Sequence, residues 1–75
     1  MCEKIILQRI SDLSDTIVSD IKIDYSFEDD LKFDNLDLAE LFMDLEAKLK
    51  ITMDYNMLYE IKTVGDLILY IKKIN

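Results

Sequence analysis

The sequence has 75 residues, 51% of them hydrophobic and 33% charged, with a formal net charge of −7 at pH 7. This length suits one small domain, and we expect a single domain over residues 1–75. Histidine is absent and Cys2 is the one cysteine, which excludes zinc sites built from those ligands, histidine general-base catalysis and an internal disulfide. An acidic chain without a basic patch is also not expected to bind nucleic acid.

The chain carries no proline and one glycine, which favours helices joined by short polar links over a turn-rich β fold. Its longest unbroken apolar run, residues 67–71, is far shorter than the roughly 20 residues needed to cross a bilayer. The first residues do not resemble a signal peptide. We therefore expect a cytoplasmic protein that does not insert into membranes.

The first predicted helix covers residues 3–19. Apolar residues recur at Ile6, Ile10, Leu13 and Ile17, a spacing of four, three and four that is typical of an amphipathic helix. Residues 20–34 show no sustained period, so we expect a long ordered loop there. The side chains expected to anchor this loop in the core are Ile21, Ile23, Phe27, Leu31 and Phe33.

The strongest predicted helix covers residues 35–50, with Asp34 or Asn35 as its N-cap. Its expected buried stripe is Leu38, Leu41, Phe42, Leu45 and Leu49. A short helix over 55–61 should follow Asp54, and a last helix over 63–73 should begin at a capping box formed by Thr63 and Asp66. These elements predict an all-α four-helix bundle with three main helices and one short one.

Negative charge is concentrated between residues 24 and 46, where nine acidic residues accompany one base, Lys32. Asp37, Glu40 and Asp44 share a face of the second helix, and Leu36 and Met43 flank it. This face is either a solvated surface or a docking surface for lysine- and arginine-lined partners. We favour docking, because self-repulsion along one helix costs stability.

The acidic run Glu28, Asp29 and Asp30 lacks the spaced ligands of an EF-hand loop. We therefore expect incidental counter-ion binding there and no specific metal site.

Several motifs in the middle of the chain together resemble the acyl carrier protein family. In chain order they are Ser26-Phe27, Asp30-Leu31, Asp34-Asn35-Leu36-Asp37, Glu40-Leu41 and Leu45-Glu46, followed by residues 61–66 and by Tyr70-Ile71. The register needs no gap from Ser26 to Ile71, so the resemblance covers well over half of the chain. Each motif is short, and it is their joint order that makes the resemblance specific.

The resemblance implies a four-helix bundle that carries acyl groups on phosphopantetheine, attached to a serine at the start of the second helix. It implies docking to acyl-transfer or synthase enzymes with basic patches, and to a phosphopantetheinyl transferase. The implied docking residues are Asp34, Leu36, Asp37, Glu40, Met43, Asp44 and Glu46. The residues that either line an acyl-chain pocket or simply close the core are Leu38, Phe42, Ile61 and Leu67. We expect a monomer.

The chain departs from the family pattern at the attachment position, which is Asn35. Phosphopantetheine is joined to a hydroxyl oxygen, and a carboxamide offers none. We expect no attached cofactor as the sequence stands, and phosphopantetheine only if residue 35 were serine.

Three functional hypotheses follow, none of them an enzyme. The first is an acyl-carrier-like docking module of fatty-acid or polyketide-type biosynthesis that carries no arm. The second is an ordinary acyl carrier protein whose serine has been replaced. The third is a small helical interaction or regulatory domain unrelated to acyl transfer, although convergence on a fold would not reproduce the register of the motifs.

Overall fold

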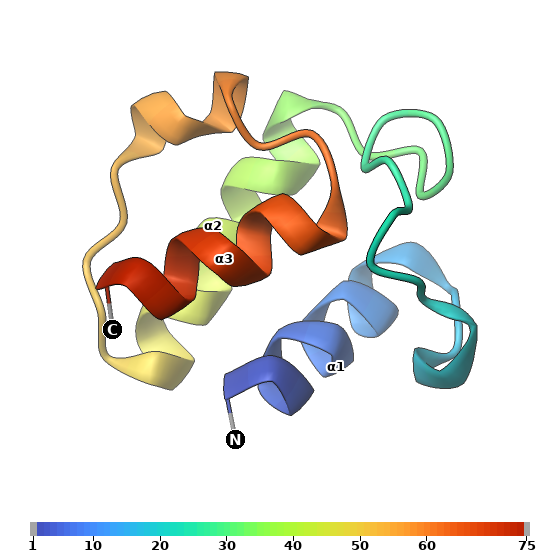
Figure 1. The fold of residues 1–75 in the computed structure, drawn as a ribbon, viewed down its shortest axis with the longest axis horizontal. Coiled ribbons are helices and arrows are strands. Elements are labelled where there is room, and N and C mark those ends of the chain that lie inside the picture. The colour runs from blue at the N-terminus through green and yellow to red at the C-terminus, as the bar shows by residue number, and fades with distance from the viewer. Residues whose placement is uncertain (1, 75) are drawn as a thin grey trace.

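The computed structural model describes residues 2–74 and is entirely helical in its regular elements within that range. The α-helices are α1 (Cys2–Ser14), α2 (Asn35–Leu49) and α3 (Val64–Ile74), and the 3₁₀ helices are η1 (Val18–Asp20) and η2 (Tyr55–Tyr59). In Figure 1, α3 crosses in front of α2, α1 lies beside this pair, and the long connection from α1 to α2 forms one end of the molecule. The predicted all-α fold is confirmed.

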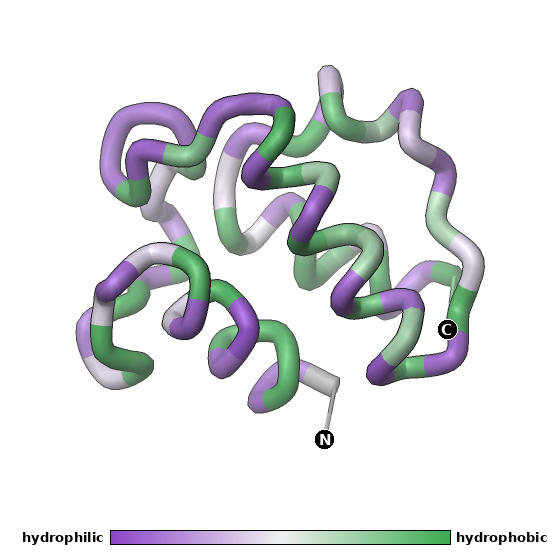
Figure 2. The backbone as a smooth tube through the Cα atoms, turned by 180° about the vertical axis from the view of Figure 1, so that it is seen from behind, coloured by the Kyte–Doolittle hydropathy of each residue, from purple (hydrophilic) through white to green (hydrophobic). Residues whose placement is uncertain are grey.

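One hydrophobic core joins the three α-helices and the long connection. Its buried side chains are Ile6, Ile10, Ile21, Phe27, Leu31, Phe33, Leu38, Leu41, Phe42, Leu45, Met53, Ile61, Val64, Leu67, Ile68 and Ile71. Figure 2 shows hydrophobic and hydrophilic residues alternating along the helices, as expected for elements with one buried side. Burying each large apolar side chain contributes roughly 1.5–3 kcal/mol, so this core is the main source of stability.

The first helix is shorter than predicted: it ends at Ser14, not at residue 19. Asp15 adopts a left-handed conformation (φ 61°), and the Ser14 hydroxyl accepts a hydrogen bond from the Thr16 N–H at 3.3 Å. Short hydroxyl side chains compete in this way with the hydrogen bonds of a helix. The predicted stripe residue Ile17 consequently lies outside α1 and is 62% exposed.

The other predicted elements need smaller corrections. Helix α2 ends one residue early because Lys50 takes a left-handed C-cap conformation. The predicted short helix over 55–61 is the 3₁₀ helix η2, capped by the Asp54 side chain, which accepts from the Asn56 N–H. Helix α3 starts and ends one residue later than predicted, at Val64 and Ile74. The predicted capping box is present: the Thr63 hydroxyl accepts from the Asp66 N–H, and Asp66 accepts from the Thr63 N–H.

The long connection is fixed to the start of α3 by backbone hydrogen bonds. The Val64 N–H donates to the Tyr25 carbonyl at 3.0 Å, and the Gly65 N–H donates to the Ile23 carbonyl at 2.8 Å. These donors belong to the first turn of a helix, where N–H groups have no partner within the helix. Ile23 therefore anchors the loop through its backbone, and the prediction that its side chain is buried was wrong, since it is 65% exposed.

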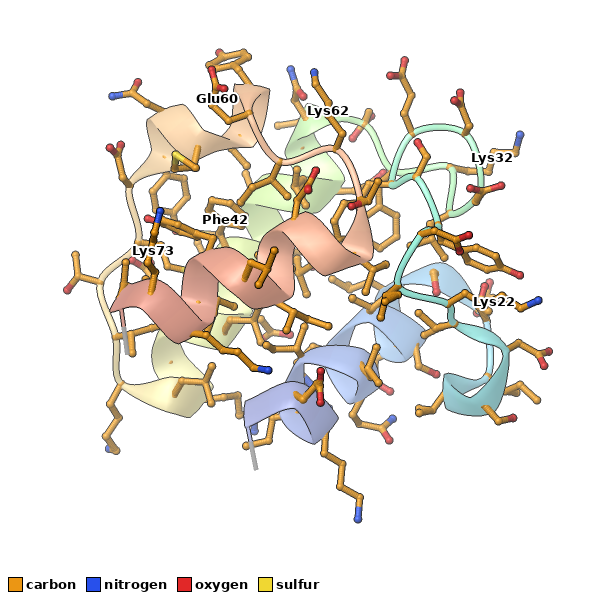
Figure 3. The ribbon with its side chains drawn as sticks, viewed as in Figure 1. Lys22, Lys32, Phe42, Glu60, Lys62 and Lys73 are labelled. Atoms are coloured by element: carbon orange, nitrogen blue, oxygen red, sulfur yellow. The ribbon has the colours of Figure 1, made fainter. Side chains whose placement is uncertain are left out.

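A second set of contacts ties η2 and the segment before it to α2 and α3. Both carboxylate oxygens of Glu46 accept hydrogen bonds, Oε2 from the Met53 N–H and Oε1 from the Tyr55 hydroxyl, each at 2.8 Å. The Tyr70 hydroxyl of α3 accepts from the Asp54 N–H at 2.8 Å. The ring of Phe42, which lies in the interior (Figure 3), packs edge-on against Tyr55 and stacks with Tyr70.

Replacing Gly65 with valine should destabilise the protein by about 1–3 kcal/mol, the usual cost of overpacking. A Cβ at this position would lie 3.1 Å from the Ile23 carbonyl oxygen, so the side chain would press on the loop at its anchor. Urea unfolding provides the measurement, and Leu69→Val, at an exposed position of the same helix, provides the control. Equal stability of the Gly65→Val and wild-type proteins would contradict the close approach.

The Tyr55 hydroxyl should make the stability fall at alkaline pH. Partial burial of the phenol, its hydrogen bond to Glu46 and the charge of that carboxylate raise the pKa of Tyr55 from 10.0 to about 12. Because the folded-state pKa is the higher one, the contribution is complete below pH 10 and is lost as the pH rises through about 12.

Comparing wild type with Tyr55→Phe in urea titrations isolates this contribution, because the two proteins differ only in this hydroxyl. Below pH 10 the variant should be less stable by about 1 kcal/mol, the net value of one hydrogen bond. The difference should shrink above that pH. A constant difference would show that the hydroxyl is not coupled to Glu46.

Candidate functional site

The start of α2 is held by a reciprocal capping box. The Asp34 carboxylate accepts from the Asp37 N–H at 2.9 Å, and the Asp37 carboxylate accepts from the Asp34 N–H at 3.1 Å. The hydrogen bond from the Asp37 N–H holds the pKa of Asp34 below its ordinary value of 3.8. The structure thus selects Asp34, and not Asn35, as the N-cap.

Asn35 is the first residue of α2, is exposed, and stands at the edge of a surface cleft of about 590 Å³. The loop, the start of α2 and the end of η2 together form this cleft. Its lining residues are Ser26, Phe27, Glu28, Lys32, Phe33, Asp34, Asn35, Leu38, Leu58, Tyr59, Ile61 and Lys62. The position that the resemblance assigns to cofactor attachment therefore adjoins a hollow in the protein surface.

The cleft combines an apolar interior with a charged edge. Phe27 and Phe33 stack with ring centroids 5.7 Å apart, and both are buried. Lys32 and Lys62 extend outward from two different segments (Figure 3), and the acidic side chains that accompany them are Glu28 and Asp34. The edge is therefore formally neutral, although the chain as a whole is acidic.

The predicted pocket residues divide into two pairs. Leu38 and Ile61 line the cleft. Phe42 and Leu67 are fully buried in the core and do not line it. A chain in the cleft would reach the second pair only if the core opened.

The side chains at the cleft do not fit covalent phosphopantetheine at the start of α2. Asn35 carries a carboxamide, which has no hydroxyl oxygen to join to a phosphate. Ser26 also lines the cleft, but it belongs to the loop, where its hydroxyl accepts from the Asp29 N–H at 3.1 Å and its N–H donates to Asp30 at 2.7 Å. That hydroxyl supports a turn of the loop.

The predicted docking residues on the outer side of α2 differ in their exposure and in the contacts that they make within the chain. Leu36 and Met43 are 79% and 58% exposed, and Glu40 is exposed as well. Asp44 lies 3.8 Å from the guanidinium of Arg9 on α1. Glu46, in contrast, accepts both of the hydrogen bonds that anchor the segment before η2.

Sequence reasoning missed the roles of Arg9 and of the lysines at the cleft. Arg9 is the one arginine of the chain and lies on the polar side of the predicted first helix, but nothing in its spacing points to Asp44. Lys32 and Lys62 are thirty positions apart, so only the tertiary structure brings them to one cleft.

Among residues 2–74 there is no helix with the length and apolarity needed to cross a membrane. Within the same range, no three or more histidine, cysteine, aspartate or glutamate side chains are arranged to hold a metal ion.

Comparisons with known proteins agree with this architecture. The family model described as "Phosphopantetheine attachment site" matches residues 4–71. An acyl carrier protein of Exiguobacterium sibiricum is 48% identical over 54 residues, which cover 72% of this chain and 68% of that protein. One from Porphyromonas gingivalis is 37% identical over 71 residues, covering 95% of this chain and 91% of that protein.

A solved structure from Mycobacterium tuberculosis, assigned as an acyl carrier protein, superposes with a TM-score of 0.85. It is 31% identical in sequence, and the match covers 97% of each chain. The family match, the relatives and the shared fold span almost the whole chain. The chain therefore belongs to the acyl carrier protein family, whose members are carrier proteins and not enzymes.

Proposed function

We propose that this chain is a module of fatty-acid or polyketide-type biosynthesis that docks partner enzymes through α2 without carrying a covalent phosphopantetheine arm. It acts in the cytoplasm as a monomer, on acyl-transfer or synthase enzymes that present basic patches. The observation that carries this proposal is Asn35. Its exposed carboxamide occupies the first position of α2, a helix that has both an N-cap and a C-cap.

The docking part of the proposal is supported by the outer side of α2. Apolar side chains as exposed as Leu36 and Met43, set beside carboxylates, are typical of a surface that a partner covers. The acidic character of the region suits lysine- or arginine-bearing partners, whose approach it would accelerate. A protein of this kind would compete with, or regulate, a loaded carrier.

An ordinary carrier with a replaced serine would share this surface and differ only at residue 35. The two hypotheses differ in the residue that the native gene encodes at position 35, which is asparagine in the first and serine in the second. Both predict that the chain with Asn35 carries no phosphopantetheine. Restoring a hydroxyl tests whether the recognition surface around the position is functional.

Incubation with coenzyme A and a phosphopantetheinyl transferase should leave the intact mass of the wild-type chain unchanged. Asn35→Ser should gain one phosphopantetheine, because the capped helix start and the docking side of α2 are in place. Asn35→Ala is the matched control and should stay unmodified. A mass gain in the wild-type protein would overturn the non-carrying assignment, and failure of Asn35→Ser would show that transferase recognition has been lost.

A second candidate function, compatible with the first, is the non-covalent holding of a free acyl chain. The observation that favours it is the cleft beside Asn35, with apolar Leu38 and Ile61 inside and Lys32 and Lys62 at its edge. Apolar clefts with a few polar groups are the usual form of small-molecule sites. Lysine ammonium groups suit the carboxylate end of such a chain.

Decanoate should shift the NMR amide signals of Phe33, Asn35 and Leu38, and Lys62→Ala should weaken its binding severalfold. Lys73→Ala is the control, since Lys73 lines a second groove, between η2 and α3, which has Ile61 in common with the cleft (Figure 3). Shifts confined to that groove, around Leu69 and Tyr70, would place the chain elsewhere. Equal binding of decanol would show that the lysines take no part.

A further inference from the structure

A second groove, of about 570 Å³, lies between η2 and α3. Its lining residues are Met57, Glu60, Ile61, Asp66, Leu69, Tyr70, Lys72 and Lys73. Among residues 2–74, none of those that line this groove belongs to α2. The groove is therefore part of a surface separate from the outer side of α2.

The middle of the groove is apolar. Ile61 is buried, Met57 and Tyr70 are half-buried, and Leu69 is 68% exposed. The Tyr70 side chain is held in place, because its hydroxyl accepts from the Asp54 N–H at 2.8 Å. A single exposed leucine is ordinary on a protein surface, but one that is grouped with other accessible apolar side chains in a groove is typical of a surface that another molecule covers.

The apolar surface continues along α3 toward the start of the helix. Gly65 precedes Leu69 by four residues, so the two positions share one side of α3. A Cβ at Gly65 would lie 3.8 Å from the Cβ of Ile23, so the 65% exposed Ile23 side chain lies beside this row. At 1.5 Å per residue, the row extends about 12 Å from Gly65 to Lys73, which is enough for two turns of a bound helix.

The row ends in two cationic side chains. Lys72 and Lys73 lie in the last turn of α3, three and four residues after Leu69. Neither makes an ion pair with another residue in the range 2–74. Successive helical residues point about 100° apart, so the two ammonium groups diverge and suit two separate carboxylates. An acidic peptide segment offers two carboxylates on one chain, whereas a fatty acid offers one.

The acidic residues of the groove do not neutralise these lysines. Asp66 accepts from the Lys62 and Thr63 N–H groups, at 3.0 and 3.1 Å, and so holds the start of α3. Glu60 is the C-cap of η2 and is well separated from Lys73 in Figure 3. An acidic segment is repelled by Glu60 and attracted by the lysines, which fixes its direction in the groove.

The part of the chain that forms the groove carries little of the negative charge. Residues 47–75 contain five lysines and three acidic residues, a formal net charge of +2. Residues 24–46, in contrast, contain nine acidic residues and one lysine. An acidic partner is therefore repelled by the long connection and α2 and directed to the side of η2 and α3.

We infer that the groove between η2 and α3 binds an acidic amphipathic segment of a second protein, with apolar side chains against Leu69 and carboxylates against Lys72 and Lys73. Such a segment binds as a helix laid in an apolar groove. This docking adds to the one proposed on α2 and does not depend on it. A chain that uses both surfaces would bring two proteins together.

The test is an NMR titration of the isotope-labelled chain with two synthetic peptides of about 14 residues, which have leucine at every third or fourth position and either glutamate or lysine at the others. The glutamate peptide should shift the amide signals of Met57, Leu69 and Lys73 and leave those of Leu36 and Glu40 in place. The lysine peptide should leave the groove signals in place, because the lysines of α3 repel it. Groove shifts of equal size with both peptides would overturn the match of charge.

Matched variants separate the charged from the apolar contacts. Changing Lys72→Gln and Lys73→Gln together should weaken binding of the glutamate peptide about fivefold, and added salt should weaken its binding to the wild-type chain. Leu69→Ala should also weaken it about fivefold, because apolar contact is lost. The controls are Lys48→Gln, in the last turn of α2, and Leu36→Ala, at an exposed position of α2, and each should change binding less than about twofold.

The possible occupants of the groove give different results. Absence of groove shifts with the glutamate peptide, or equal binding by the groove and control variants, would overturn this inference and leave the α2 proposal standing, since that proposal is tested by the modification of Asn35→Ser. Shifts of the groove signals when the chain alone is diluted would assign the groove to a second copy of this chain and would also overturn the inference.

Discussion

The burial of one side of α2 is the constraint on which the other features depend. Leu41, Phe42 and Leu45 are completely enclosed by α1, α3 and the loop, and Leu38 nearly so. At 3.6 residues per turn, fixing these positions also fixes which side chains face outward. Leu36, Glu40 and Met43 are thus exposed because the opposite side of the helix is buried in the core. Their exposure does not depend on which residue occupies position 35.

The starts of α2 and α3 are held in the same way. Both helices begin with capping boxes that use a carboxylate, at Asp34 and Asp37 and at Thr63 and Asp66. The first turn of α3 additionally uses the loop carbonyls of Ile23 and Tyr25. These contacts fix the loop beside both helix starts, and the cleft next to Asn35 lies between this loop, the start of α2 and the end of η2.

Much of this could be predicted from the sequence, because the period of the apolar residues reports directly on burial. The caps at Asp34, Asp54 and Thr63 follow from local patterns that the structure confirms. The α2 stripe is confirmed from Leu38 to Leu45, whereas Leu49, at the end of the helix, is only half-buried. Ile17 was misassigned because its spacing continues the stripe of α1, while the interruption lies in the backbone of Asp15. A residue in the left-handed conformation does not change the spacing of apolar residues along the sequence, so that spacing gives no sign of it.

The candidate site was less predictable, since its chemistry depends on contacts between distant residues. Glu46 and Asp44 look like Glu40 in the sequence: each is an acid on the polar side of an amphipathic helix. Only the tertiary structure shows that Tyr55 and Met53 hold one of them and that Arg9 approaches another. A run of charge therefore marks where a surface lies, but not which of its members are free to bind.

Asn35 can occupy its position because attachment and folding use different atoms. The carrier's hydroxyl would project from the first residue of α2, whereas the helix start is held by Asp34 and Asp37 through backbone N–H groups on either side of it. A carboxamide at this exposed position removes the chemistry of attachment and costs the fold nothing that the capping box supplies. A chain of this family can therefore lose the hydroxyl that would carry the arm and keep the structure of its α2 start.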